Sequence, residues 1–181
     1  MNDQTENDTY IETYTGKKFY FLNPLCSDID IIDIAHSLSM QCRYTGHAKE
    51  FFSIAEHSIL VAELCSDENK LWGLLHDGSE AYLTDVASPI KPFLKNYKKM
   101  EKVLMDAICT KYGLKTSMPE EVHIADMEVL RSEASKLMTS KGADWKINQN
   151  NDSPIIDLNI QCMSPFEAKI KFIEKFYEYC K

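Results

Sequence analysis

Apolar residues recur every three or four positions through most of the chain after residue 27, and this spacing limits the fold more than any other feature of the sequence. A repeat near 3.6 residues is typical of amphipathic helices, whereas strands alternate with a period of two. The apolar sets that indicate helices are Ile31, Ala35, Leu38 and Cys42; Ala55, Ile59 and Ala62; Leu71, Leu74, Leu75, Gly78 and Tyr82; Phe93, Tyr97, Met100, Leu104 and Ile108; and Val122, Ala125 and Val129. No convincing order of strands accompanies them, so the chain is predicted to be all-α.

Short polar motifs predict where several of these helices begin and end. Ser66 or Asp67 is a candidate N-cap for the third helix, and Gly113 is a natural stop for the fourth. Ser117-Met-Pro-Glu120 and Ser164-Pro-Phe-Glu167 each have the spacing of a capping box. The second box precedes a C-terminal helix over 164–180. The predicted apolar face of that helix consists of Phe166, Ile170, Ile173 and Tyr177.

The length of 181 residues suits one domain, because a chain of this size buries roughly 70% of its unfolded surface. Residues 1–27 are predicted to be irregular or to form short extended segments. A Lys-, Asn- and Asp-rich stretch over about 139–160 is predicted to be a long loop. We therefore expect a single domain over 1–181.

Composition excludes several classes of function. A net charge of −8 is unlike the basic surface of a duplex-binding protein, so no nucleic-acid polymer is expected as a partner. No apolar run approaches the roughly 20 residues that span a bilayer, and the polar, acidic start is not a signal peptide. The six cysteines contain no C-x-x-C pair and are interpreted as reduced thiols of a cytoplasmic protein.

The segment LLHDGSEAYLTD, residues 74–85, combines core-forming leucines with one histidine and three acidic residues. On a helix His76 and Glu80 share a face, and Asp77 lies about 100° round from His76. His57 and Asp126 stand beside apolar neighbours in two other predicted helices, which favours inward-pointing side chains. Each of these residues alone is typical of a solvated helix face or a structural ion pair. Together they have the residue types of a divalent-metal site.

Five stretches carry a resemblance to a known family: CRYTGH, AEHS, LLHDGSEAYLTDVASPIK, KMEKVL and IADMEVL. With them the chain resembles the HD-domain metal-dependent phosphohydrolases, and among these the 5'-deoxynucleotidase branch. It is similar to 5'-deoxynucleotidases of bacteria and prophages and to phage dATP triphosphohydrolases. The match runs from ETYTGKKF to the final helix, and it implies an HD-domain helical bundle.

The resemblance also implies a role for individual residues. The metal ligands would be His57, His76, Asp77 and Asp126, around one divalent ion; Co, Mn, Zn, Fe and Mg all suit the ligand types to different degrees. Glu80 corresponds to the family's catalytic carboxylate, and Asp85 to a second acidic residue near the phosphate. Arg43 corresponds to a phosphate-binding arginine. Tyr44 takes the place of an aromatic residue near the sugar 2' position, where some members carry tryptophan.

Elementary chemistry is consistent with these roles. Two imidazoles and two carboxylates leave a divalent ion nearly neutral, so a phosphate needs further cations, and Arg43 suits bidentate phosphate binding. Glu80 would orient a water or relay a proton. His47 follows Gly46 in the arginine loop and is a candidate for phosphate binding or for support of a metal ligand. Lys91 is a further candidate, because it follows Asp85 in a loop that we expect to border the site.

Lys91, Lys95, Lys98 and Lys102 form a basic stripe that is either a solvated face or an extension of a polyphosphate pocket. His36 is expected to be a partly buried histidine and His123 an exposed one, neither of them a ligand.

These observations predict metal-dependent hydrolysis of the 5'-phosphate ester of 2'-deoxynucleotides. The products would be a deoxynucleoside plus phosphate, or plus triphosphate if dATP is the substrate. A preference for dATP or deoxyadenylate is expected, and a broad dNMP 5'-deoxynucleotidase is the alternative. A non-catalytic protein that binds or sequesters nucleotides is an alternative of another class. The resemblance implies a homo-oligomer, a dimer or hexamer, in the cytoplasm, or in the host cytoplasm if the chain is phage-encoded.

Overall fold

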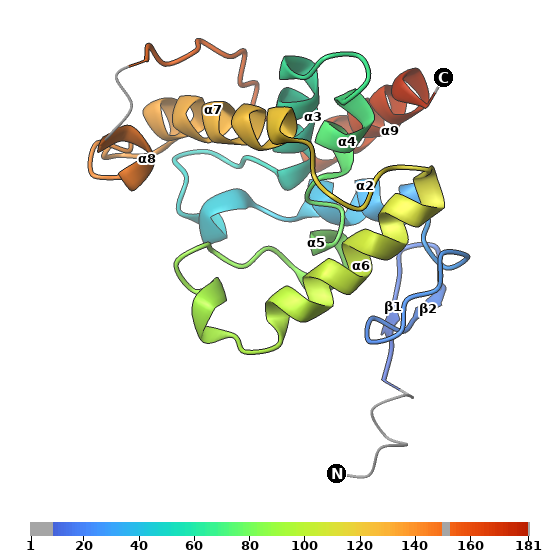
Figure 1. Cartoon of the computed structure of the whole chain (residues 1–181). Coiled ribbons are helices and arrows are strands. Elements are labelled where there is room, and N and C mark those ends of the chain that lie inside the picture. The colour runs from blue at the N-terminus through green and yellow to red at the C-terminus, as the bar shows by residue number, and fades with distance from the viewer. Residues whose placement is uncertain (1–8, 150–152, 181) are drawn as a thin grey trace.

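The computed structural model describes residues 9–149 and 153–180, and helices dominate it (Figure 1). The helices in chain order are α2 (Ile31–Met40), α3 (Ile54–Leu64), α4 (Lys70–Leu75), α5 (Glu80–Leu83), α6 (Tyr97–Tyr112), α7 (Glu120–Leu137), α8 (Lys146–Gln149) and α9 (Pro165–Tyr179), with 3₁₀ turns at Arg43–Gly46 and Lys91–Phe93. Two short strands, β1 (Ile11–Glu12) and β2 (Lys18–Phe19), pair antiparallel near the N-terminus. The prediction of an all-α fold is confirmed, as is short extended structure before residue 28.

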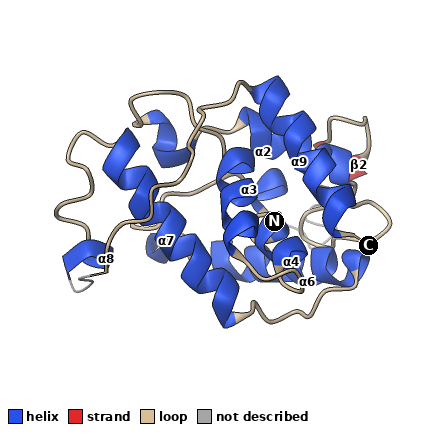
Figure 2. Ribbon diagram, turned by 90° about the horizontal axis from the view of Figure 1, so that it is seen from above, coloured by secondary structure: helices blue, strands red, loops and turns tan. Residues whose placement is uncertain are grey.

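Helix α3 is the central element of the fold, and it contacts α2, α4, α7 and α9 (Figure 2). Every residue from Ile54 to Ala62 is buried, as expected for a helix enclosed on all sides. Ser53 caps its start by accepting the backbone N–H of Glu56 at 3.1 Å. Polar residues on such a helix need partners inside the protein, and two of them, Glu56 and His57, organise the rest of the structure.

Glu56 attaches the C-terminal segment to α3. Its carboxylate accepts the backbone N–H groups of Gln161, Cys162 and Met163 at 2.7, 3.0 and 2.7 Å. Helix α9 begins directly afterwards with the predicted capping box of Ser164 and Glu167. The route of the chain after the long loop therefore depends on one buried carboxylate.

Most of the predicted apolar face of α9 was wrong, because only Ile173 of its four residues packs against the core. Phe166, Ile170 and Tyr177 are 73%, 41% and 61% exposed, whereas Ala168, Phe172 and Phe176 are buried. Both stripes have helical spacing, so periodicity did not distinguish them. The small side chain of Ala168 lies on the buried face, which packs against α2.

The third predicted helix is broken in the middle, which corrects the expectation of one continuous helix through Tyr82. Helix α4 ends at Leu75, residues 76–79 form turns, and α5 begins at Glu80. The N–H of Gly78 donates to the carbonyl of Leu75 at 2.8 Å, a tight bond spanning three residues instead of four. The start of α4 also differs from the prediction. The N-cap is Asn69, not Ser66 or Asp67, and no side chain caps the helix.

Three other boundaries differ from the prediction. Helix α2 ends at Met40, so Cys42 lies beyond it and pairs with Ser53 in an isolated antiparallel bridge. Phe93 belongs to the separate 3₁₀ turn and is 82% exposed, because the backbone becomes extended at Leu94. Helix α7 follows Pro119, whose side chain cannot accept a hydrogen bond, so the first predicted capping box does not form.

Other expectations are confirmed. Gly113 ends α6 with a φ of 69°, the left-handed conformation that glycine adopts without strain. All six cysteines are free. The predicted loop over 139–160 consists mainly of turns and extended backbone but contains the short helix α8, and residues 150–152 of that prediction lie outside the described residues. Within the described ranges no helix has the length and apolar character needed to cross a membrane.

Candidate metal centre

Three side chains from separate segments bring potential metal donors together. His57 comes from α3, His76 directly follows α4, and Asp126 lies on α7. The Nε2 atom of His57 lies 3.3 Å from Nε2 of His76 and 3.2 Å from Oδ1 of Asp126. The third distance, from His76 Nε2 to Asp126 Oδ1, is 3.9 Å. These three residues form a cluster whose donor atoms lie close enough together to hold a metal ion.

Asp77 reaches the same cluster from the turn after α4. Its Oδ2 atom lies 3.2 Å from Nε2 of His76 and 3.7 Å from Nε2 of His57. The same oxygen is 3.7 Å from Nη1 of Arg43, which connects the cluster to the arginine turn. All four residues implied as ligands thus lie together.

The two imidazoles are oriented by bonds to their other nitrogens. Nδ1 of His57 lies 2.6 Å from Oε1 of Glu133, and Nδ1 of His76 lies 2.7 Å from the carbonyl oxygen of Gly73. Both partners are acceptors, so each Nδ1 carries a proton, and in the neutral form of each imidazole Nε2 keeps its lone pair. This is how metal-binding histidines are held in proteins. Donors about 2.0–2.2 Å from one ion lie roughly 3–3.5 Å apart, so the donor set fits a divalent metal.

Comparison with known proteins places the chain among relatives. The uncharacterized protein YfdR of Escherichia coli K12 is 36% identical over 169 residues, 93% of this chain and 94% of the relative. The chain belongs to the YfdR family. An uncharacterized protein of Rhodobacter capsulatus is 29% identical over 179 residues, covering 90% of this chain and 91% of the relative. No family model matches the chain. Neither relative's name states an activity, so only the side chains of this YfdR-family protein indicate its chemistry.

Charge in the cluster favours bound cations. Burial opposes protonation of His76, but Asp77 and Asp126 outweigh it and raise the pKa of His76 to about 9. Burial opposes ionisation of Asp77, but His76, His57 and Arg43 hold its pKa below its usual range. The carboxylates are therefore charged, and protons compete with a metal ion for the imidazole nitrogens.

Glu133 is the most informative residue that sequence reasoning missed. It is fully buried on α7. Besides His57, its carboxylate accepts Nε of Arg43 at 3.1 Å and the hydroxyl of Tyr44 at 2.5 Å. Burial opposes its ionisation, but Arg43 and His57 lower the pKa of Glu133 overall. A signal was available, because Glu133 lies two helical turns after Asp126 and so on the same face of the helix.

The arginine turn itself has an unusual backbone. Tyr44 and Thr45 both adopt positive φ, at 56° and 53°, a conformation that costs non-glycine residues energy. The backbone on either side is fixed, since Arg43 N–H donates to the carbonyl of Phe52 at 2.9 Å. This geometry points the side chains of Arg43 and Tyr44 together at Glu133.

Glu80 lies near the cluster, but no hydrogen bond or ion pair among the described residues joins it to the donor atoms. It is 4% exposed, with Oε1 3.2 Å from Nζ of Lys91 and with Oε2 lacking a hydrogen-bond partner among the described residues. Burial is the main reason that the pKa of Glu80 rises to about 9; Asp77 and Asp85 add to it, and Lys91 opposes it. The raised pKa favours the protonated form of Glu80, which can donate a hydrogen bond.

Gln41, also missed from the sequence, fixes the backbone between Glu80 and Asp85. Its Nε2 donates to the carbonyl of Glu80 at 3.0 Å, and its Oε1 accepts the N–H of Asp85 at 3.0 Å. Burial raises the pKa of Asp85, and Arg43 opposes that rise while Asp77 adds to it. Asp85 therefore faces the same electrostatic environment as the cluster.

The remaining predicted site residues occupy less central positions. Lys91 is only 21% exposed and contacts Glu101 at 2.8 Å as well as Glu80, so it is partly buried and paired, whereas Lys95 is exposed. His47 is exposed at the end of the arginine turn, and no hydrogen bond or ion pair among the described residues joins its side chain to the cluster. His36 is partly buried and stacks on Tyr14 with ring centroids 3.7 Å apart. His123 is exposed, as expected.

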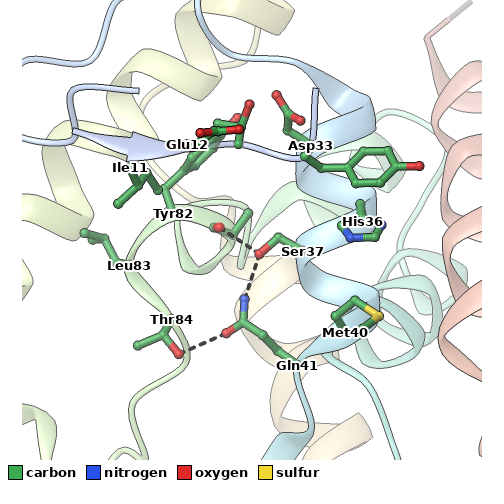
Figure 3. Close-up of a pocket in the computed structure, with 13 residues that line it drawn as sticks. Ile11, Glu12, Asp33, His36, Ser37, Met40, Gln41, Tyr82, Leu83 and Thr84 are labelled. Carbon is green, nitrogen blue, oxygen red and sulfur yellow. Dashed lines mark hydrogen bonds between the residues drawn. The ribbon is translucent and has the colours of Figure 1, made fainter. Parts of the chain in front are cut away.

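A cavity of about 680 Å³ lies beside the site but does not include the cluster (Figure 3). Its walls come from β1, α2 and residues 81–84. Gln41 and Thr84 line it and are joined by a 3.1 Å hydrogen bond. The cavity thus shares a wall with the segment that carries Glu80 and Asp85.

Proposed function

We propose that this YfdR-family protein is a metal-dependent phosphohydrolase that cleaves the 5'-phosphate ester of 2'-deoxynucleotides. The observation that carries the proposal is the convergence of His57, His76, Asp77 and Asp126 next to Arg43. A cation site beside a buried guanidinium suits an anionic substrate such as a phosphate ester. The order of these residues along the chain also resembles that of the HD-domain phosphohydrolases.

The four clustered residues would hold one divalent ion. When bound, such an ion supplies Lewis-acid chemistry, lowering the pKa of a water and polarising a phosphoryl oxygen. Co, Mn, Zn, Fe and Mg are all compatible with two imidazoles and two carboxylates. Glu133 and the Gly73 carbonyl keep both histidines in the tautomer that leaves Nε2 free.

Arg43 would bind the phosphate that is attacked. Its Nε is committed to Glu133, and Nη1 lies 3.7 Å from Asp77, so the outer edge of the guanidinium remains for the substrate. A guanidinium has a planar fork of donors that matches two phosphate oxygens. Because Glu133 and Asp77 fix this fork, substrate binding would require little further ordering of the side chain.

Glu80 would deliver the proton to the leaving group. Hydrolysis breaks the bond between phosphorus and the 5'-oxygen, and the departing oxygen needs a proton to leave as an alcohol. The raised pKa of Glu80 favours its protonated form, and its Oε2 is unpaired among the described residues. Lys91 fixes the other oxygen, Oε1, at 3.2 Å. General acid catalysis by a positioned carboxyl contributes typically 10²–10⁴-fold.

The number of phosphates on the preferred substrate is a separate question. An extension of a polyphosphate pocket was one of the two alternatives for the lysine stripe, but Lys91 is paired with Glu80 and Glu101. This pairing favours a deoxynucleoside monophosphate over dATP, so a 5'-deoxynucleotidase is the preferred form of the proposal. A dATP triphosphohydrolase, breaking the same bond, is the second candidate.

The decisive experiment is a product assay over dNMPs, dNTPs and their ribonucleotide counterparts, each with several divalent metals. We expect deoxynucleoside and inorganic phosphate from dNMPs. Release of triphosphate from dATP alone would replace the monophosphate form with the second candidate. Tight nucleotide binding without product would identify a sequestering protein, and absence of bound metal would reduce the cluster to structural ion pairs.

A further inference from the structure

A tryptophan from the long loop lies against the arginine turn. The rings of Trp145 and Tyr44 have centroids 5.8 Å apart and are tilted by 47°. The Tyr44 ring in turn lies 5.4 Å from Cζ of Arg43. Trp145 is partly exposed, so a face or edge of the indole remains accessible. Two successive contacts thus link the indole to the residue proposed to bind phosphate.

The loop that carries Trp145 is attached to α7, the helix of Asp126 and Glu133. Nε of Arg131 donates to Oδ1 of Asn148 at 3.2 Å, and Nδ2 of Asn148 donates to the carbonyl of Gly142 at 2.8 Å. A Cβ atom on Gly142 would lie 2.8 Å from Cβ of Ala134, so only glycine allows the turn to pack this closely on α7. Figure 1 shows α8 beside one end of α7. Trp145 therefore has a fixed position relative to the metal centre.

Tyr44 contributes a ring but not a free hydroxyl. Its hydroxyl donates to Glu133 at 2.5 Å, so its proton is not available for donation to a substrate. What Tyr44 and Trp145 present together is aromatic surface. Such surface binds nucleobases by stacking, which tolerates different bases because every base has a π face.

We propose that Trp145, with Tyr44, binds the nucleobase of the substrate by stacking. The inference rests on the proposed function for the position of the phosphate at Arg43, with the base extending from it towards the loop. Stacking without hydrogen-bond readout implies that purine nucleotides bind more tightly than pyrimidine nucleotides, with little discrimination between adenine and guanine. Trp145 is thus a specificity-determining residue for substrate binding and takes no part in proton transfer.

Fluorescence tests this without requiring turnover. The chain has two tryptophans. Trp72 is buried, and its indole N–H donates to the carbonyl of Lys115 at 2.9 Å. We expect dAMP and its product deoxyadenosine to quench the emission of the wild type and of Trp72→Phe, and not of Trp145→Phe. Deoxyribose 5-phosphate, which has no base, should quench none of them.

Kinetics supplies the second readout. Trp145→Ala should raise KM for dAMP roughly 10-fold or more, the scale of one base–aromatic stack, with kcat little changed. Its kcat/KM for deoxyribose 5-phosphate should match that of the wild type, and Trp145→Phe should restore most of the affinity for dAMP.

Quenching that persists in Trp145→Phe would overturn the proposal, as would equal losses on dAMP and deoxyribose 5-phosphate. If no nucleotide is hydrolysed, the proposed function fails, and quenching by deoxyadenosine still decides whether Trp145 binds a base. Absence of quenching in an active wild-type enzyme would overturn the base site alone.

Discussion

Glu133 holds His57 by a 2.6 Å contact between Oε1 and Nδ1, deep inside the protein. The other oxygen of the same carboxylate accepts Nε of Arg43. One buried side chain therefore orients a proposed metal ligand and the proposed phosphate ligand together. Metal binding and substrate binding should be coupled through it.

Replacing Glu133 by glutamine should weaken metal binding without removing a metal ligand. The amide keeps the size of the side chain but removes the charge that faces His57 and Arg43. Loss of such a supporting partner typically lowers metal affinity by about 10–100-fold. Isothermal titration with Mn²⁺ or Co²⁺ measures the change. Glu128→Gln is the matched control, because Glu128 lies on the same helix and pairs with Arg131 at 2.9 Å. Equal affinities for wild type and Glu133→Gln would contradict the coupling.

Asp126→Asn should abolish stabilisation by metal. An ion at 100 times its Kd stabilises the folded state by about 2.7 kcal/mol, and for a chain of this length each kcal/mol raises Tm by roughly 2–4 °C. We expect metal to raise Tm by this amount in the wild type and in the control variant Asp106→Asn. In the wild type the Asp106 carboxylate pairs with Lys102 on the surface of α6. Thermal unfolding with and without metal gives the answer. A normal rise in Asp126→Asn would exclude Asp126 as a ligand.

Glu80→Gln should separate catalysis from metal binding. Glu80 makes no contact with the donor atoms, so the variant should bind metal normally while kcat falls by roughly 10²-fold or more. Glu101→Gln is the control, since Glu101 is the other partner of Lys91, at 2.8 Å. The metal content of the purified variants and their turnover of dAMP are the measurements. Loss of metal from Glu80→Gln would move Glu80 into the ligand set.

The pH dependence of kcat/KM should report the proton on Glu80. Its raised pKa means that the carboxyl donates a proton below that pKa and is charged above it, so activity should fall as pH rises through the pKa. Lys91 opposes the rise and Asp85 adds to it. Lys91→Met should therefore move the fall to higher pH, and Asp85→Asn to lower pH. An unchanged alkaline fall in Glu80→Gln would assign it to another group.

Substitutions of Arg43 and of the exposed Lys95 should each affect the hydrolysis of dAMP and of dATP to the same extent. Arg43→Ala should damage hydrolysis of dAMP and dATP equally, because both place a phosphate at Arg43. Lys95 is exposed in the turn before α6, and Lys95→Ala should have little effect on either substrate. Assays at low and high salt provide the check, since salt screens exposed charges. A loss confined to dATP and removed by salt would favour the triphosphohydrolase.

Local sequence pattern was sufficient to find the helices that carry the cluster. Val122, Ala125 and Val129 are all buried on α7, and this places Asp126 at the edge of the packed face. His57 lies on a helix that is apolar on nearly every side, so its inward direction followed from its neighbours. Where apolar spacing sets the direction of a side chain, the sequence was informative.

Residues that act through distant partners could not be predicted in this way. Gln41 and Glu80 are 39 positions apart, and His57 and Glu133 are 76 apart. Nothing local to Gln41 indicates its contact. Glu133 shares a helix face with Asp126, but its contacts with His57 and Arg43 exist only after the helices pack. The break between α4 and α5 was equally hidden, because tight turns and a helix place apolar residues at similar intervals.

Two adjacent residues on α3 have different roles. His57 faces the cluster, whereas Glu56 accepts hydrogen bonds from the backbone of Gln161, Cys162 and Met163. Hydrogen bonds to a charged group contribute about 1.5–3 kcal/mol each, so these bonds account for a sizeable part of the stability of a small protein. Loss of these three backbone donors, which lower the pKa of Glu56 against the effect of burial, would favour a protonated Glu56 one position from His57. Loss of this C-terminal segment would also remove the buried residues Ala168, Phe172 and Phe176, so the end of the chain supports the position of His57 through α3 and without a direct contact.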